Sequence, residues 1–471
     1  MPHPEIVSIA IVGGGASAVL LLVALEKRAT FFPALIELHI FEANKTLGRG
    51  CAYGTKSDVY MLNTSAKSMS VHDEKQIDFI DWLQDRPNGL GEVPRSLYGD
   101  YLEQRLREAT GRLVAKGHSV HIHFETVLSI NIGRRHRIRS EQRQLHVDHC
   151  IVATGGRPNV PVRWMNSDRY IPSALDEKSL LSIPKGSSVG ILGTGQSAID
   201  ACLFLEHAQI VDRYTLISRD GLLPRVNSDL DRPRNAGHPN HIFSLSEMKT
   251  RVLRTIHWQT NGDKWLRPGS FRAMEIDLKR ALRTRPSWQT AMSELTPVIN
   301  RIWEHTDHQS REHFLRHDFK TLRHLRSAIP TVTASKFLTL HRHARLELLA
   351  GKYSLRDKIT HIEYKGRDMH RTFNYLINAS GFDAASFVDL LADDITNRRV
   401  SVNSLGGLNV EAQSMRPLTA KDQPVLGLYA IGYPALGSVL IVNSIELIRQ
   451  CATAIANTIF SVRPNASEYK S

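Results

Sequence analysis

The beginning of the chain shows two hydrophobic patterns separated by three glycines. Residues 9–12 (Ile-Ala-Ile-Val) form a short continuous apolar run, which is typical of a buried strand. Glycines occupy positions 13–15, and an Ala- and Leu-rich stretch compatible with a helix follows from residue 16. The pattern therefore predicts a strand, a tight turn and a helix, in that order.

The same arrangement recurs 180 residues further along the chain. Residues 189–192 (Val-Gly-Ile-Leu) predict a strand, and Gly193 and Gly195 precede another helical pattern. Both turns have the spacing Gly-x-Gly-x-x-Ala, which ends at Ala18 in the first and at Ala198 in the second. One such match is common by chance, but two in the same context predict two dinucleotide-binding units. In such units, glycines let backbone N–H groups approach a pyrophosphate at the start of the helix.

The residue that ends the second strand of each unit indicates the nucleotide, because it faces the adenosine ribose. In the first unit this residue is Glu42, whose carboxylate suits the ribose hydroxyls of FAD or NAD. In the second unit the strand ends at Ser218 and Arg219. A guanidinium suits a 2′-phosphate, so NADPH is favoured over NADH. The neighbouring Asp220 leaves NADH as the alternative.

Small residues follow two further apolar runs. They are Ala153-Thr154-Gly155-Gly156 and Asn378-Ala379-Ser380-Gly381. Such residues let the chain turn close to a cofactor or cross between domains, and a plain exit from a strand is the alternative.

These patterns predict an α/β fold with two Rossmann-like dinucleotide-binding domains, in which helices cover mainly parallel sheets. The FAD-binding domain is expected to be discontinuous, with the NADPH-binding domain inserted into it. Its two parts are expected at residues 1–165 and 370–471, on either side of the NADPH-binding domain at 166–369. Within the latter, residues from about 222 to 335 are expected to form a helical insertion, because their sequence interrupts the alternation of strands and helices.

Composition and cysteine content narrow the class of protein. The chain has 471 residues, of which 42% are hydrophobic and 23% charged, as expected for a folded protein of two or three domains. No apolar stretch approaches the roughly 20 residues of a membrane span, and the N-terminal residues lack a signal-peptide pattern. We therefore expect a cytoplasmic protein without membrane contact. The four cysteines are far apart and form no C-x-x-C motif, which disfavours a disulfide framework, a zinc knuckle or a dithiol redox centre.

The net charge of +13 is concentrated in one part of the chain. Residues 219–345 contain 23 Lys and Arg, 12 Asp and Glu, and ten of the 22 histidines. Such a region attracts nucleic acid, an acidic membrane or a small anionic substrate, unless the charges only cover solvated helix faces. The strands carry no interleaved aromatic residues of the kind that RNA-binding proteins use, so no nucleic-acid partner is expected. The histidine pairs at 313/317 and 341/343 lack a neighbouring carboxylate motif, so no metal site is expected.

A series of segments, taken in order, resembles the family of FAD/NAD(P)-binding proteins that includes FAD-dependent urate hydroxylases and aspartate N-monooxygenases. The segments are GGGASA, Glu42, GRGCAYGTKSDVYMLNTSAKSMS, ATGGRP, GTGQSA, SRDGLLPR, NASG and GLYAIGYPALGSVLIVNSIELIRQ. More distantly, the chain is similar to flavin-containing and N-hydroxylating monooxygenases, and the likeness covers nearly its whole length. The resemblance implies that FAD and NADPH are the cofactors.

The resemblance also assigns site residues to both coenzymes. For FAD it implies Gly13, Gly15, Ala16, Ser17, Ala18, Glu42, Tyr53, Asn63, Val127, Thr154, Gly155, Gly432 and Asn443. For NADPH it implies Gly193, Gly195, Gln196, Ser197, Ser218 and Arg219. The chain departs from many flavoproteins at Gly432-Tyr433, where a Gly-Asp pair usually precedes the last helix. Asn443 and Glu446 indicate a helix start that either aims N–H groups at the flavin or is an ordinary capped helix.

The activity implied by the resemblance is that of a flavin-dependent monooxygenase. NADPH reduces FAD, the reduced flavin adds O2 to give a C4a-(hydro)peroxyflavin, and one oxygen atom passes to carbon or nitrogen of a small anionic metabolite. Because the flavin carries this chemistry, no catalytic side chain is expected. The cations expected to hold the substrate, unless they lie at the surface or contact the NADPH phosphate, are Arg225, Arg267, Arg316, Arg323 and Arg326.

Two other classes of protein stay open at this point. A flavin-dependent electron-transfer reductase would share the nucleotide motifs and pass electrons from NADPH to another acceptor without incorporating oxygen. A non-catalytic flavoprotein would use the basic region to bind a polyanion. Labelled O2 in the product separates the reductase from a monooxygenase, and salt-sensitive binding of nucleic acid would support the third class.

Overall fold

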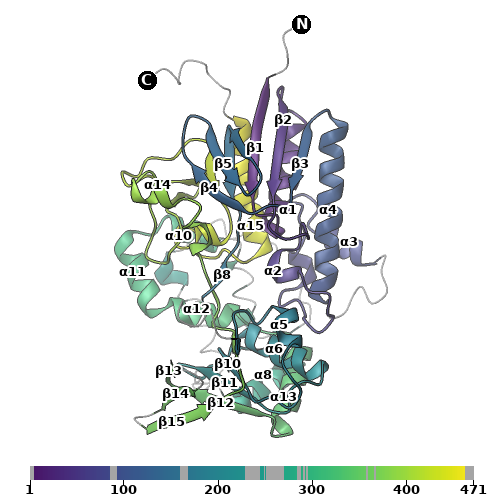
Figure 1. The fold of residues 1–471 in the computed structure, drawn as a ribbon, viewed down its shortest axis with the longest axis vertical. Helices are drawn as coiled ribbons and strands as arrows, with labels where there is room; N and C mark the ends of the chain where they lie inside the picture. Colours follow the sequence, from purple (N-terminus) through teal and green to yellow (C-terminus); the bar gives the residue numbers. More distant parts are fainter. Residues whose placement is uncertain are drawn as a thin grey trace.

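The chain forms two sheets of parallel strands, one above the other in Figure 1, with helices around each. The structure is a computed structural model. It describes residues 5–84, 93–159, 168–228, 244–248, 250, 270–283, 288–289, 292, 295–296, 298–356, 359–364 and 367–461, with the backbone alone between 352 and 370. The two sheets confirm the predicted α/β fold with Rossmann-like units.

The first sheet takes strands from both ends of the chain. Its strand order is β20–β7–β1–β2–β3, and all neighbouring pairs are parallel. The strands are β1 (Ile6–Val12), β2 (Leu35–Phe41), β3 (Ser119–His123), β7 (His149–Val152) and β20 (Leu428–Ala430). Helices α1 (Ala16–Ala29), α4 (Arg95–Ala115) and α15 (Ile445–Ser461) belong to this first unit.

Helix α1 is buried along most of its length, which explains why its sequence is apolar on every face. Residues 18–23 are all buried. Both α4 and α15 contact α1, and its remaining side faces the sheet. A helix enclosed in this way has little polar surface to present to water, so it does not need an amphipathic pattern.

The second sheet has the order β12–β11–β10–β16–β9 and is also parallel throughout. Its strands are β9 (Tyr170–Ile171), β10 (Val189–Leu192), β11 (Tyr214–Ser218), β12 (Leu346–Ala350) and β16 (Tyr375–Asn378). Helices α5 (Glu177–Leu181), α6 (Gln196–His207), α8 (Phe271–Ala281) and α13 (Thr331–Arg342) complete this second unit. The second glycine turn joins β10 to α6.

Strand β16 corrects the expected domain boundary at residue 370. It pairs with β10 and β9, so it belongs to the second unit, and the antiparallel strands β13 (Lys352–Arg356), β14 (Ile359–Tyr364) and β15 (Arg367–Thr372) lead into it. Ile377 of β16 is fully buried between these neighbours. An apolar run alone does not indicate which of two sheets it joins, so the sequence placed the boundary too early.

Two short strands mark where the chain crosses between the units. β8 (Arg157–Pro158) follows β7, β17 (Phe382–Asp383) follows β16, and the two pair antiparallel. The small-residue segments 153–156 and 378–381 therefore lie at the two crossings, as one of the sequence alternatives predicted. Both crossings run between the two sheets, where a cofactor would lie.

The remaining elements surround the first unit. An antiparallel sheet contains β4 (Val127–Asn131), β5 (His136–Ser140) and β6 (Gln144–Val147), and a smaller one contains β18 (Val410–Glu411) and β19 (Arg416–Pro417). The short helices are α2 (Gly50–Tyr53), α3 (Asp78–Gln84), α14 (Ala392–Thr396) and the 3-10 turns Ala66–Ser68, Ala385–Phe387 and Tyr433–Ala435. Among the described residues, no helix combines the length and the apolar character that a membrane span requires.

The expected helical insertion divides between two cores. Its first described helix, α8, packs with α13 in the second unit. Helices α10 (Ile299–Glu304), α11 (His308–His317) and α12 (Phe319–Arg326) form another core, which also contains Leu440, Ile441 and Leu447 from the C-terminal segment. Figure 1 shows α10, α11 and α12 beside the first unit and above the second sheet.

Hydrogen bonds fasten α10 to the C-terminal segment. The Asn300 side chain accepts from Ile441 N at 3.0 Å and donates to Ile441 O at 3.2 Å. Trp303 Nε1 donates to Gly437 O at 2.7 Å. The insertion is therefore attached to the part of the chain that precedes α15, and not only to the second unit in which it is inserted.

Candidate coenzyme and substrate site

The first glycine turn has the geometry of an anion cradle. Gly13 has a φ of +105°, and a Cβ at this position would collide with the carbonyl oxygen of Ala153. Gly15 precedes helix α1, whose first turn receives no side-chain cap. The N–H groups at the start of α1 and the positive end of its dipole are therefore available to a phosphate.

The second turn repeats this geometry. Gly193 has a φ of +129°, and a Cβ there would collide with the carbonyl oxygen of Ala379. Gly195 has φ −86° and ψ −165°, against −81° and −163° for Gly15. Helix α6 likewise starts without a side-chain cap. Each turn thus lies against one of the two crossings, and each fits a dinucleotide pyrophosphate.

One cavity of about 1960 Å³ joins the two turns. An ordinary small-molecule pocket has roughly 300–1,000 Å³, so this cavity has room for more than one ligand. It extends from the first turn to the second and reaches the insertion and the start of α15. The two units therefore open toward each other, and two bound dinucleotides would share one space.

Most of the site residues expected from the sequence line this cavity. They are Gly13, Gly15, Ala16, Ser17, Glu42, Tyr53, Asn63, Thr154, Gly155, Gly193, Gly195, Gln196, Ser197, Ser218, Arg219, Arg323, Arg326, Gly432 and Asn443. Four expected residues are described by the structure but do not line it: Ala18, Val127, Arg225 and Arg316. Arg267 lies outside the described residues.

The four residues that do not line the cavity have other surroundings. Ala18 is fully buried in α1, where its small side chain lets the helix pack closely, and Val127 starts β4 in the core of the first unit. Arg225 is buried and forms an ion pair with Asp277 at 2.5 Å. Arg316 lies at the surface, 70% exposed, and pairs with Glu312 one helical turn away. Arg225 and Arg316 therefore do not face a ligand in this structure.

The Glu42 carboxylate is held in place by three N–H donors. Glu42 Oε2 accepts from Gly14 N at 2.9 Å, and Oε1 accepts from the backbone and the side-chain nitrogen of Asn44 at 2.9 and 3.0 Å. Each carboxylate oxygen can accept more than one hydrogen bond. Glu42 is therefore oriented at the cavity wall with acceptor capacity left for a ribose.

Ser218 occupies the position in the second unit that Glu42 occupies in the first. Glu42 follows Phe41, which pairs with Val12 before the first turn, and Ser218 follows Ile217, which pairs with Leu192 before the second. Ser218 Oγ lies 3.0 Å from Thr194 Oγ1 and accepts from Gly221 N at 2.9 Å. A carboxylate that would repel a 2′-phosphate is thus replaced by a hydroxyl.

Arg219 is the charged group beside Ser218 that lines the cavity. Its side chain is exposed at the mouth. Asp220, the residue that left NADH open from the sequence, forms an ion pair with Lys320 of α12 at 2.5 Å. Because Lys320 neutralises this carboxylate, the local charge near Arg219 favours a phosphate more than the sequence alone indicates.

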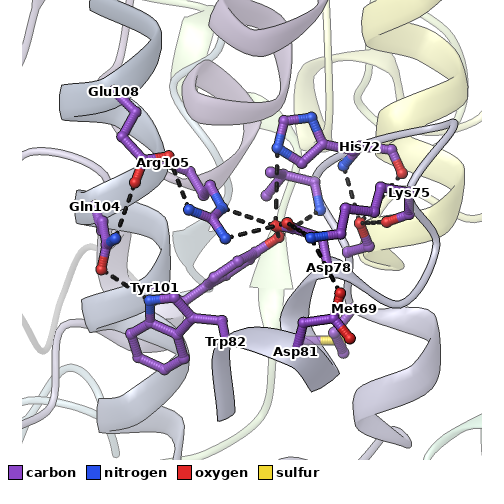
Figure 2. Close-up of polar contacts among 12 residues, drawn as sticks. Met69, His72, Lys75, Asp78, Asp81, Trp82, Tyr101, Gln104, Arg105 and Glu108 are labelled. Carbon is purple, nitrogen blue, oxygen red and sulfur yellow. Dashed lines mark hydrogen bonds and ion pairs between the residues drawn. The ribbon is translucent and has the colours of Figure 1, made fainter. Parts of the chain in front are cut away.

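A buried polar network supports the cavity wall at Met69 (Figure 2). Tyr98 donates to Met69 O at 2.8 Å. Tyr101 accepts from Val71 N at 3.0 Å and donates to Asp78 at 2.9 Å. These bonds connect the carbonyl of Met69 at the wall, and the N–H of Val71 two residues further on, to side chains of α4 and α3, so the wall segment is fixed by these helices.

Arg105 closes this network from α4. Its Nε and Nη2 atoms donate to both carboxylate oxygens of Asp78, at 2.7 and 3.1 Å (Figure 2). Burial alone would raise the pKa of Asp78, but the hydrogen bonds from Arg105 and Tyr101 outweigh it and hold the pKa below its usual value. Asp78 is therefore a buried anion with its partners in place, which rigidifies this side of the cavity.

The C-terminal segment brings Gly432 and the start of α15 to the cavity. Gly432 has a φ of +74°, and a side chain there would crowd Ser17 in α1. Tyr433 lines the cavity where many flavoproteins carry Asp, and burial raises the pKa of its phenol. Helix α15 begins at Ile445, one residue later than a cap at Asn443 would give, and Glu446 in its first turn lines the cavity.

The insertion adds the guanidinium of Arg326 to the same space. Arg326 Nη1 donates to Thr296 Oγ1 at 2.9 Å, and the structure gives Arg326 no ion pair with the described residues. Burial lowers the pKa of Arg326 to about 10, although Glu446 opposes the change. An arginine of this kind has several donors directed at the cavity and attracts an anion.

Several residues around Arg326 were not expected from the sequence. Trp288, Met292 and Thr296 line the cavity together with the C-terminal Leu440. The first three lie in a stretch without a motif, and only the folded chain brings them to the two glycine turns. Among the described residues, no group of three or more His, Cys, Asp and Glu could hold a metal ion.

Two Rossmann-like units that face one cavity define the class of fold. The sequence family described as FAD-NAD(P)-binding matches residues 10–157, which contain the first turn. No curated protein matches the chain. The comparison with urate hydroxylases and aspartate N-monooxygenases stays a prediction.

Solved structures with this fold include flavin-dependent hydroxylases. The ornithine N-hydroxylase of Kutzneria sp. 744, with reduced FAD, NADP+ and L-ornithine, has a TM-score of 0.61 and 15% identity, over 96% of this chain and 98% of that one. The FAD-bound cadaverine monooxygenase of Erwinia amylovora has a TM-score of 0.59 and 12% identity, over 96% and 94%. The bacillithiol disulfide reductase of Bacillus cereus has a TM-score of 0.53 and 13% identity, over 97% of this chain and 99% of that one. These likenesses extend to the whole fold.

Proposed function

We propose that the chain is an FAD-dependent NADPH monooxygenase that transfers one oxygen atom from O2 to carbon or nitrogen of a small anionic metabolite. The observation that carries the proposal is the single cavity into which both glycine turns open. FAD, when bound, supplies hydride acceptance and reaction with O2. The task of the chain is to bind, to orient and to exclude water.

The two turns divide the binding of the coenzymes. In the first unit, the start of α1 binds the FAD pyrophosphate, and Glu42 accepts hydrogen bonds from the ribose. In the second unit, the start of α6 binds the NADPH pyrophosphate, and Arg219 pairs with the 2′-phosphate beside Ser218. The difference between Glu42 and Ser218 is the reason to assign FAD to the first turn and NADPH to the second.

Apolar side chains support oxygen transfer rather than electron transfer to an outside acceptor. Met69, Leu440 and, from the insertion, Trp288 and Met292 line the cavity. Such a wall keeps water away from the reacting groups and limits side reactions with water before oxygen is transferred. A reductase for an external protein or dye would instead need an open approach to the flavin.

Arg326 is the group that we assign to the substrate anion. Its guanidinium is buried and donates one hydrogen bond to a described residue, Thr296, so a carboxylate could form a paired contact with it. Glu446 lines the same cavity and could accept from an amino group. An amino acid or another carboxylate therefore fits better than a diamine such as cadaverine, which has no anionic group.

The proposal is tested by measuring NADPH consumption with a panel of small carboxylates and matched neutral amides under 18O2. We expect a carboxylate to stimulate NADPH oxidation well above its amide, with 18O in the product. Stimulation without 18O in the product would identify an electron-transfer reductase. Equal stimulation by the amides would contradict the proposal that the substrate is an anion. Salt-sensitive nucleic-acid binding without NADPH oxidation would support the non-catalytic class.

A further inference from the structure

A buried ion pair joins the two nucleotide-binding units. Arg95 Nη2 lies 2.8 Å from Asp200 Oδ2, and the two side chains are only 12% and 6% exposed. Arg95 is the first residue of α4 in the first unit, whereas Asp200 lies in α6 of the second unit. The start of α6 forms part of the second glycine turn, and Arg95 lines the cavity into which this turn opens, so the pair connects the two.

The same arginine also holds part of the cavity wall. Arg95 Nε donates to Met61 O at 3.1 Å, and Arg95 N donates to Tyr60 O at 2.7 Å. Met61, Leu62 and Asn63 line the cavity in the first unit. One guanidinium therefore connects the helix behind the second turn with the wall of the first unit.

The wall segment 59–63 has two more contacts with the second unit. Tyr60 is almost fully buried in the core of that unit and stacks on Phe204 of α6, with ring centroids 5.5 Å apart. The carbonyl oxygen of Asn63 accepts from Asn227 Nδ2 at 3.0 Å. The segment is therefore anchored to both units, and Arg95 and Asp200 form the charged contact between them.

Because this pair is buried, the positions of Arg95 and Asp200 relative to each other are tightly constrained. Burial raises the pKa of the Asp200 carboxyl, and Arg95 opposes that change. If the two units rotate apart, the Asp200 carboxylate loses its partner in a nonpolar environment. Orientations of the two units that separate Arg95 from Asp200 are thus disfavoured. Small apolar contacts alone would let one unit slide against the other.

We propose that Arg95 and Asp200 are positioning residues that set how the NADPH cradle faces the flavin cavity. The inference rests on the proposed function, because it assumes that FAD is reduced by NADPH within one cavity. Hydride transfer requires the reacting atoms to approach to roughly 3–3.5 Å, so a small change in the orientation of the units slows it strongly. Asp200 does not line the cavity and acts through α6 and Arg95.

The test compares Asp200→Asn with the control variant Glu206→Gln. Asn has nearly the shape of Asp and removes the charge. Glu206 lies on the same helix and pairs with Arg345, which belongs to the second unit, so its ion pair does not join the units. Hydrogen–deuterium exchange of residues 59–63 is measured in the cofactor-free protein. Anaerobic flavin reduction by NADPH and by dithionite is measured in the FAD-loaded protein.

We expect Asp200→Asn to speed exchange in residues 59–63 and to slow reduction by NADPH roughly tenfold to a hundredfold. Reduction by dithionite and FAD content should stay at wild-type values, as should all measurements on Glu206→Gln. Arg95→Lys provides a second variant, which keeps the charge but lacks the Nε donor to Met61. We expect it to speed exchange as well.

Wild-type exchange together with wild-type NADPH reduction in both Asp200→Asn and Arg95→Lys would overturn the inference. A wild-type protein that binds no FAD, or whose FAD is not reduced by NADPH, would overturn the proposed function instead. In that case the exchange measurement still decides whether the ion pair couples the wall to α6. The two failures are therefore distinguishable.

Discussion

Replacing Arg326 by methionine is expected to stabilise the ligand-free protein and to weaken anion binding. Arg326 lines the cavity, where burial lowers the pKa of its guanidinium to about 10 from the usual 12.5. Thr296 accepts one hydrogen bond from it and also donates to Met292 O at 2.7 Å. Thr296 therefore keeps a hydrogen bond in the variant, and methionine retains the apolar part of the arginine side chain.

The pKa gives the size of the expected effect. The difference between 12.5 and about 10 corresponds to about 3 kcal/mol by which burial disfavours the charged form. Replacing a buried charge by an apolar group of similar volume is often stabilising, so the free energy of unfolding should rise by about 1–3 kcal/mol. Loss of the charge-assisted contact should raise the Kd of a carboxylate about tenfold to a hundredfold.

Chemical denaturation and calorimetric titration with the stimulating carboxylate measure these two effects. Arg316→Met is the matched control, because Arg316 is exposed, pairs with Glu312 and does not line the cavity. It should change neither quantity by more than about 0.5 kcal/mol. An Arg326→Met protein that is less stable than wild type and binds the carboxylate equally well would refute the assignment of Arg326.

Four further variants or conditions test other parts of the site and fold. Gly193→Ala should abolish NADPH binding but keep FAD, measured by titration, because its Cβ collides with the second crossing. Arg219→Ala should raise the KM for NADPH about tenfold by removing the phosphate contact. Tyr101→Phe should lower the free energy of unfolding by about 1–3 kcal/mol, measured by denaturation, because Val71 N and Asp78 each lose a hydrogen bond. Lowering the pH from 6.5 to 4 should destabilise the protein by up to about 3 kcal/mol through His39, whose pKa burial lowers to about 4, so that the unfolded chain gains a proton first.

Each of these predictions has a control and a contradicting result. Gly111→Ala, a change in open space within α4, should leave NADPH binding intact. The KM for NADH should not change in Arg219→Ala, and an equal rise for both coenzymes would contradict a 2′-phosphate contact. Wild-type stability of Tyr101→Phe would contradict the network in Figure 2. His39→Gln should reduce the loss of stability between pH 6.5 and 4, while His149 and His324, whose pKa values burial also lowers to about 4, keep their share, and an unchanged profile would exclude a contribution from His39.

The geometry of the two glycine turns was predictable because its requirements are local. Gly13 and Gly193 need a positive φ and room for a neighbouring carbonyl, and both requirements appear as glycine at a set distance from a strand. The positions of Glu42 and Ser218 were also predictable, because Glu42 directly follows the second strand of its unit and Ser218 is the last residue of the corresponding strand. The pairing of Asp220 with Lys320 could not be predicted from the sequence, since these residues are a hundred positions apart.

The substrate side of the cavity depends on contacts that no local pattern encodes. Arg225 and Arg326 look alike in the sequence, but Asp277 neutralises the first, whereas the second faces the cavity. Trp288 and Leu440 come together only because the insertion packs on the C-terminal segment. In the same way, the sequence shows β16 as an apolar run but does not show which sheet it joins.

The proposed function requires that one cavity binds FAD and NADPH at the same time, each at its own glycine turn. This is measured by titrating the cofactor-free protein with FAD, and then the FAD-loaded protein with NADP+. We expect one FAD and one NADP+ per chain, with FAD retained when NADP+ binds. Displacement of FAD by NADP+, or binding of neither coenzyme, would contradict it.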